Sequence, residues 1–166
     1  QAWTDLRSFA VAASLATLYD NDAHRPHIRE DAIWEVERGR ALTAPQIQRA
    51  SAIRSAWFRR AAALFDTVDA LVAPTAQVWP FPVDWAHPKE IAGRKMDTYH
   101  RWMECVIPAS LIGLPAAAVP AGFGDTGLPF GLQIIGPARG DLAVLQLAEG
   151  WHRATGWPQK RPAMRA

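Results

Sequence analysis

The sequence holds a single cysteine, Cys105, among 166 residues. A disulfide framework within the chain is therefore excluded, and one thiol is typical of a reducing compartment. No apolar run reaches the roughly 18 residues that a membrane span needs, and no charged and then apolar leader opens the chain. We therefore expect a cytoplasmic protein without membrane association. The first residue is Gln1, which is compatible with a processed start, a missing upstream segment or a beginning within a longer protein.

An excess of charge of one sign is also missing. The 18 basic and 16 acidic residues leave a net charge of +2, and the basic residues are spread along the chain. This balance argues against a nucleic-acid partner. With 49% hydrophobic and 20% charged residues the composition is that of a globular protein. The length is enough to bury a core, and we see neither an internal repeat nor a linker that would divide the chain.

The local patterns of serine and cysteine catalysis are absent as well. The five serines lie outside any G-x-S-x-G pattern and have no glycine neighbours: Ser8, Ser14, Ser51, Ser55 and Ser110. All but Ser110 fall within predicted helices, where a solvated or back-bonded hydroxyl is usual. No base lies near Ser110 in sequence, although a base distant in sequence is compatible with the pattern. Cys105 has apolar neighbours, which favours a buried and inert thiol over a nucleophile.

Two further motifs have a plain structural interpretation. Residues 122–127 read G-x-G-x-x-G, but an apolar run with β character follows instead of a helix, so we interpret them as a hairpin turn and not as a phosphate loop. His24 and His27, with Glu30 and Asp31 nearby, resemble metal ligands in type. Pro26 interrupts a helix between the two histidines, so the pattern predicts a solvated turn.

Residues 1–68 are predicted to be mainly helical. Apolar residues keep helical spacing from Trp3 to the polar turn at Asp20. A second helix is expected over residues 28–40, stopping around Gly39. The third begins at a capping box, in which Thr43 accepts from the first-turn amides and Gln46 reaches back.

Residues 69–166 are predicted to contribute to a sheet and to end in a closing helix. A short apolar strand over residues 70–73 is expected to be central in its sheet, with both faces covered, and to stop at Pro74. The remaining expected elements follow in order: a loop over residues 75–87, a short helix over 99–107 ending before Pro108, strands over 116–119 and 130–135, and a last helix capped by Asp141 and ending at Gly156.

Five segments carry a resemblance to a known family. Residues 113–123 (GLPAAAVPAGF) and 127–137 (GLPFGLQIIGP) resemble the carboxy-terminal block of the amidase-signature family. Three further segments agree with it in order and spacing: 69–75 (DALVAPT), 96–104 (MDTYHRWME, similar to a subgroup of bacterial amidases) and 141–148 (DLAVLQLA). The resemblance covers essentially the whole chain and is densest between Asp69 and Gly156.

The resemblance implies an α/β fold in which helices pack on a mixed β-sheet, with residues 1–166 forming the carboxy-terminal part of a single amidase domain. It implies hydrolysis of carboxamide C–N bonds by a Ser–cis-Ser–Lys triad, without a metal or organic cofactor. A serine attacks the amide carbonyl, the second serine and an unprotonated lysine relay the proton, and water hydrolyses the acyl-enzyme.

The chain departs from the family by lacking the triad. It contains no Ser-Ser or Gly-Gly pair, and its three lysines lie in a loop, before a helix and in the tail. No catalytic residue is therefore assigned in this chain. The resemblance implies that the segment before the Gly-Leu-Pro block lines the acyl side of the substrate pocket, through Met103, Val106 and Ala109. Plain core packing of these three residues is the alternative. An apolar wall would favour a hydrophobic acyl group over glutamine.

Three hypotheses follow from these observations. The chain is part of an amidase that acts on a small-molecule amide and depends on the missing amino-terminal portion for chemistry and full folding. Alternatively it is a non-catalytic subunit or binding module that pairs with a separate amidase chain, or a free-standing structural domain. Association with copies of itself stays open. In the first case we expect open sheet edges and exposed apolar surface when the chain is isolated.

Overall fold

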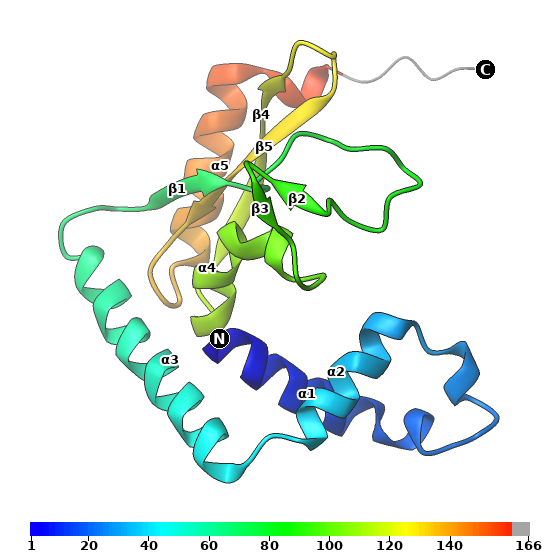
Figure 1. Ribbon diagram of the computed structural model, residues 1–166. Coiled ribbons are helices and arrows are strands. Elements are labelled where there is room, and N and C mark those ends of the chain that lie inside the picture. Colours follow the sequence, from blue (N-terminus) through cyan, green and yellow to red (C-terminus); the bar gives the residue numbers. More distant parts are fainter. Residues whose placement is uncertain (161–166) are drawn as a thin grey trace. The chain divides into compact units, whose positions relative to one another are not determined.

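The computed structural model describes residues 1–160. They form two compact units, residues 1–60 and a second unit from Ala61 onward (Figure 1). Residues 161–166 of the predicted carboxy-terminal segment lie outside the described residues. No helix in the described part is both long enough and apolar enough to cross a membrane.

The first unit is helical, as the sequence predicts. It contains α1 (Ala2–Tyr19), a 3-10 turn η1 (Arg25–His27) and α2 (Glu30–Arg40). The helix predicted from Ile28 begins two residues later, because Arg29 is still extended, with ψ of 146°. The helix ends at Arg40, as predicted, and Gly39 lies within its last turn. Gly39 is a buried residue of α2, and the α2 backbone there passes directly against α1 at Ser8 and Ala12.

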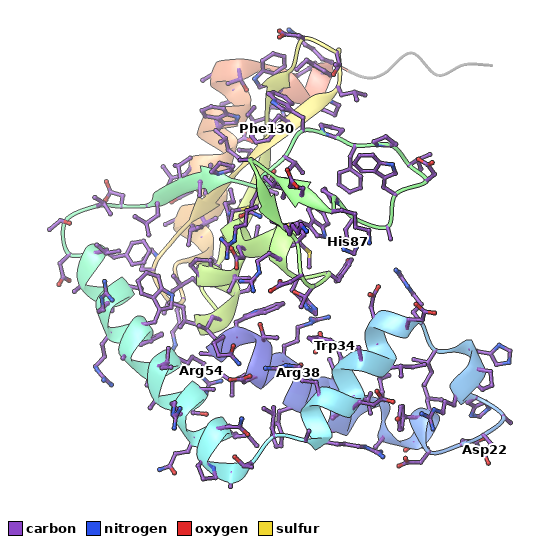
Figure 2. All side chains as sticks on the ribbon, viewed as in Figure 1. Asp22, Trp34, Arg38, Arg54, His87 and Phe130 are labelled. Atoms are coloured by element: carbon purple, nitrogen blue, oxygen red, sulfur yellow. The ribbon has the colours of Figure 1, made fainter. Side chains whose placement is uncertain are left out.

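A polar network is buried where α1 and α2 pack together. Ser8 is fully buried and donates from Oγ to Oε2 of Glu35 at 2.5 Å. The other carboxylate oxygen of Glu35 accepts from Nε of Arg7 at 2.8 Å. Arg38, labelled in Figure 2, pairs with Asp5 and donates from Nη1 to the Ser8 hydroxyl at 3.2 Å. Buried charges are tolerated when they are paired and hydrogen-bonded in this way.

The third helix, α3 (Ala44–Leu64), begins after the predicted capping box. The Gln46 side chain does reach back, accepting from the Thr43 backbone N–H at 2.8 Å, and it also accepts from the Thr43 hydroxyl at 2.9 Å. Two apolar side chains of α3, Ile53 and Leu64, are exposed, at 48% and 42%.

The second unit is built on a three-stranded antiparallel sheet in the order β1-β5-β4. Its strands are β1 (Leu71–Pro74), β4 (Ala116–Phe123) and β5 (Pro129–Ile135). Ile135 of the central strand pairs with Leu71 on one side and Ala116 on the other. Helices and sheet together confirm the α/β fold class, and every strand pairing within this sheet is antiparallel.

The prediction that the first strand is central in its sheet is wrong for this chain. Among residues 1–160, β1 lies at the edge and pairs only with β5, and Val72 is 62% exposed. The continuous apolar run in β1 gives no information about the number of neighbouring strands. An exposed edge with an apolar face fits the expected open sheet edge.

The glycine-rich motif forms the β4–β5 hairpin turn, as predicted. The Gly127 N–H donates to the Gly124 carbonyl at 2.8 Å, and the Gly124 N–H donates to the Leu128 carbonyl at 2.9 Å. Gly127 has φ of 74°, a left-handed conformation that favours glycine. The register shifts between Pro120 and Gly122, where proline has no N–H to offer the ladder.

A second, two-stranded sheet joins β2 (Glu90–Ile91) to β3 (Arg94–Lys95) and is not among the predicted elements. Its two-residue turn places both Ala92 and Gly93 at positive φ, 49° and 80°. This is the backbone requirement of a tight hairpin turn, and an Ala-Gly pair signals it only weakly.

The closing helix α5 (Asp141–Thr155) packs on β4 and β5. Val144 is buried, and a β-carbon on Gly136 would lie 2.4 Å from its Cγ2. Trp151 donates from Nε1 to the Pro120 carbonyl at 2.8 Å. The predicted cap is displaced by one residue, because Gly140 occupies the N-cap position and Asp141 begins the helix. The predicted end is confirmed, since Gly156 has φ of 61°.

Candidate functional site

The candidate site lies on the segment that connects the β2–β3 hairpin to β4. It consists of a 3-10 helix, η2 (Arg101–Val106), followed directly by the short helix α4 (Ile107–Ile112). The predicted helix over residues 99–107 is therefore present in part, but the prediction that it ends before Pro108 is wrong. Pro108 lies in the first turn of α4, a position that suits the fixed φ of proline.

The three predicted pocket residues follow one another at intervals of three. Met103 and Val106 are half-buried on η2, and Ala109 is buried on α4 at 6% exposure. Residues three apart eclipse one another on a 3-10 helix and are neighbours on an α-helix. The segment therefore brings Met103, Val106 and Ala109 to one side. Their role in substrate binding stays a prediction.

Gln133, which is not among the residues predicted for the site, connects this segment to the sheet. Its side chain, 5% exposed, donates from Nε2 to the Pro74 carbonyl at 2.7 Å and to the Cys105 carbonyl at 3.2 Å. The one signal in the sequence is a lone amide within the apolar run 130–135. A polar residue in a buried strand predicts a buried hydrogen bond but does not identify the partner.

An ionic cluster borders η2 at its start. Arg101 holds the Asp97 carboxylate with two parallel hydrogen bonds, at 2.8 and 2.9 Å, and donates to Glu104 at 2.7 Å. Arg94 lies 3.4 Å from the other oxygen of Glu104. The Arg101 hydrogen bonds lower the pKa of Asp97 and, reciprocally, the two carboxylates raise the pKa of Arg101. This edge of the segment is therefore charged, whereas the Met103, Val106 and Ala109 side is apolar.

The loop over residues 75–89 packs aromatic rings against the same segment. Phe81 meets Trp102 edge-on, with ring centroids 5.5 Å apart, and Gln77 donates from Nε2 to the Arg101 carbonyl at 2.9 Å. His87, labelled in Figure 2, meets Tyr99 edge-on at 5.9 Å. Edge-to-face contacts of this kind stabilise an otherwise irregular segment. The predicted long loop is thus present, and it packs on η2, the 3-10 helix that carries Met103.

The candidate nucleophiles agree with a structural role. Burial raises the pKa of the Cys105 thiol, which keeps it protonated and inert near neutral pH. Ser14 donates back to the Val11 carbonyl at 3.1 Å, as predicted within a helix. The prediction is wrong for Ser8, which is neither solvated nor back-bonded: it is fully buried and donates to Glu35 of the neighbouring helix. Ser110 is exposed on α4.

The interpretation of His24 and His27 as a solvated turn also holds. His27 belongs to η1, His24 precedes it, and both side chains are exposed. Over residues 1–160 no group of three or more histidine, cysteine, aspartate or glutamate side chains is arranged to hold a metal ion.

Comparison with known protein families and sequences gives a consistent match. The sequence model of the family described as Amidase matches residues 5–145. A glutamyl-tRNA(Gln) amidotransferase subunit from Dehalococcoides mccartyi is 38% identical over 103 residues, which are 60% of this chain and 19% of that protein. The corresponding subunit from Symbiobacterium thermophilum is 38% identical over 120 residues, 70% of this chain and 22% of that protein.

Solved structures agree with these matches. A bacterial aryl acylamidase of the amidase signature family is similar with a TM-score of 0.81 and 28% identity, over 97% of this chain and 36% of that chain. The 6-aminohexanoate cyclic dimer hydrolase, at 18% identity and a TM-score of 0.76, is similar in fold alone, again over 36% of its length. The chain thus spans about a fifth of these curated relatives and about a third of these solved ones.

Proposed function

We infer, from the premise that this chain belongs to the amidase-signature family, that it is the carboxy-terminal portion of an enzyme that hydrolyses carboxamide C–N bonds. The similarity to an aryl acylamidase over nearly the whole of this chain supports the inference. The chain spans only about a third of that enzyme, so the remaining portion has to supply the catalytic groups.

The Ser–cis-Ser–Lys triad of the family belongs to that other portion. Its serine would form the acyl-enzyme as the amine leaves with the relayed proton, and water would then release the acid. The contribution of this chain is structural and selective. It completes the sheet and offers Met103, Val106 and Ala109 as an apolar wall for the acyl group.

One observation carries the selectivity part of the proposal. The three side chains recur at intervals of three on one side of a segment whose charged groups, Arg101 and Glu104, pair with each other. An apolar strip without a free charge suits a hydrophobic acyl group better than the carboxamide of glutamine. We therefore expect the intact enzyme to prefer amides of apolar acids.

The test is a series of amides assayed with the intact enzyme and with Val106→Asp. Burying a carboxylate in an apolar wall is expected to lower kcat/KM for hexanamide by about tenfold or more, and that for acetamide by less. Val83→Asp is the matched control, because Val83 is fully exposed, at 104%. An unchanged preference in Val106→Asp contradicts the apolar wall. A wild-type enzyme that hydrolyses none of the amides contradicts the amidase proposal.

A second candidate is a polypeptide that pairs with a separate amidase chain. The similarity to glutamyl-tRNA(Gln) amidotransferase subunits favours it, because those relatives are parts of an assembly by name. A denaturing intact mass of the native protein separates the two candidates. A species several-fold heavier than 18.3 kDa supports one enzyme chain, whereas an 18.3 kDa chain beside a second polypeptide supports a separate subunit.

A further inference from the structure

The side-chain amide of Gln133 is buried at the centre of the sheet. Gln133 lies on β5 between two apolar residues, Leu132 and Ile134, and only 5% of its surface is exposed. An amide in such a position destabilises the fold unless its donors find acceptors. Both acceptors here are backbone carbonyls, of Pro74 at 2.7 Å and of Cys105 at 3.2 Å.

The two carbonyls belong to elements that are far apart in the sequence. Pro74 is the last residue of β1, and Cys105 lies on η2 between Met103 and Val106. In a 3-10 helix the Cys105 carbonyl would accept from the N–H three residues later, but that residue is Pro108, which has none. Gln133 supplies a donor to this carbonyl and so holds η2 onto the sheet.

The hydrogen bond that holds the start of η2 is weaker. At its start the Arg101 carbonyl accepts from Gln77, whose side chain is exposed, so water competes for this hydrogen bond. The Gln133 hydrogen bonds lie on the part of η2 that carries Met103 and Val106. A loss of the Gln133 donors would therefore displace or loosen these two side chains more than the rest of the segment.

We propose that Gln133 is a positioning residue: by fixing the Cys105 carbonyl relative to the end of β1, it sets the position of Met103 and Val106 and hence which acyl groups the enzyme accepts. This inference rests on the proposed amidase function. Gln133 itself is buried on β5, and it acts on selectivity through Met103 and Val106 of η2.

The test compares Gln133→Met with the wild type in the intact enzyme. Methionine has a similar length and no donor, so the cavity stays filled while both hydrogen bonds are lost. We expect kcat/KM for hexanamide relative to acetamide to change by about three- to tenfold, mainly through KM, as the loss of one or two net hydrogen bonds implies. Gln146→Met, at an exposed position of α5, is the matched control and leaves the ratio unchanged.

A second readout does not depend on activity. Alkylation of Cys105 by iodoacetamide, followed by peptide mass spectrometry, reports whether η2 is held in place. We expect about a three- to tenfold faster reaction in Gln133→Met, because the half-buried thiol becomes accessible when the turn loosens. If Gln133→Met does not fold, Gln133→Asn replaces it, since this variant keeps an amide that is one methylene shorter.

The outcomes are distinguishable. A shifted ratio with faster alkylation supports the proposal. An active variant with a lower melting temperature and an unchanged ratio makes Gln133 purely structural and overturns the proposal, while the amidase function stands. An unchanged alkylation rate also overturns it. A wild-type enzyme without amide hydrolysis removes the proposed function, and the selectivity role of Gln133 is overturned with it.

Discussion

Gly39 of α2 lies against Ser8 of α1 so closely that a β-carbon on Gly39 would be 2.1 Å from the Ser8 carbonyl oxygen. The same β-carbon would be 2.7 Å from Cβ of Ala12. Both distances are far below van der Waals contact, and one of the atoms is backbone, which cannot move aside as a flexible side chain does. The close packing of the first two helices therefore depends on glycine at position 39.

Gly39→Ala is expected to destabilise the intact protein by about 1–3 kcal/mol, the usual cost of overpacking. Gly150→Ala is the control, because Gly150 lies within α5 and a β-carbon there would meet nothing within 4 Å. Alanine at that helical position is expected to stabilise by about 0.5–1 kcal/mol. Urea denaturation of both variants measures the two effects, and equal effects of the same sign would contradict the close packing.

Replacing Glu35 tests the buried network between α1 and α2. Glu35→Gln keeps the size of the side chain but removes the charge that accepts from Ser8 and Arg7. We expect a loss of about 1–3 kcal/mol in the free energy of unfolding, measured by urea denaturation. Glu37→Gln serves as the matched control, since the exposed Glu37 carboxylate binds Tyr19 at the surface. We expect this substitution to lower the free energy of unfolding by less than about 1 kcal/mol.

The Asp97–Arg101 pair is expected to make the stability of the fold depend on pH, with stability falling as the pH is lowered. The hydrogen bonds from Arg101 hold the pKa of Asp97 below its usual value of about 3.9. A group whose pKa is lower in the folded state stabilises the fold above the unfolded pKa, and this contribution is lost as the pH falls through the folded pKa. Asp97→Asn is therefore expected to lower the urea midpoint at pH 7, and the difference from wild type shrinks below about pH 4.

Asp66→Asn is the control for this prediction. Asp66 is exposed and has no ion pair in the part of the chain that the structure describes. In Asp66→Asn, the change in the urea midpoint between pH 7 and pH 3 should equal the change in the wild type. A constant difference between Asp97→Asn and wild type from pH 7 to pH 3 would show that the pair contributes nothing to the pH dependence.

The exposed leucines of α5 test whether another portion of an amidase covers this unit. Leu142 and Leu145, three residues apart on this helix, are 70% and 61% exposed although both are apolar. In the chain alone, replacing both by lysine should raise soluble yield, because exposed apolar area promotes association. In the intact amidase the same change should lower the stability by about 2 kcal/mol or more if the leucines are covered there. Equal stability of the intact variant and wild type would place these leucines in solvent.

Part of the candidate site could be predicted from the sequence. The GLP-containing blocks led to the family and to the segment carrying Met103, Val106 and Ala109, and the glycines at 124 and 127 predicted the hairpin. The prediction that Pro108 ends a helix is wrong, because the same residue type either ends a helix or starts one. The preceding turn decides between these outcomes, and that turn is a 3-10 helix here.

The sequence by itself determined the local elements of this protein, because helical periodicity, glycine at positive φ and proline without an N–H act within a few residues. Only the tertiary structure decided that β1 is an edge strand, that Ser8 binds Glu35, and that Gln133 joins Pro74 to Cys105. Each of these contacts links residues more than 25 positions apart. The physical reason is that a buried donor requires an acceptor, but its own sequence neighbourhood does not specify which distant carbonyl or carboxylate the fold brings to it.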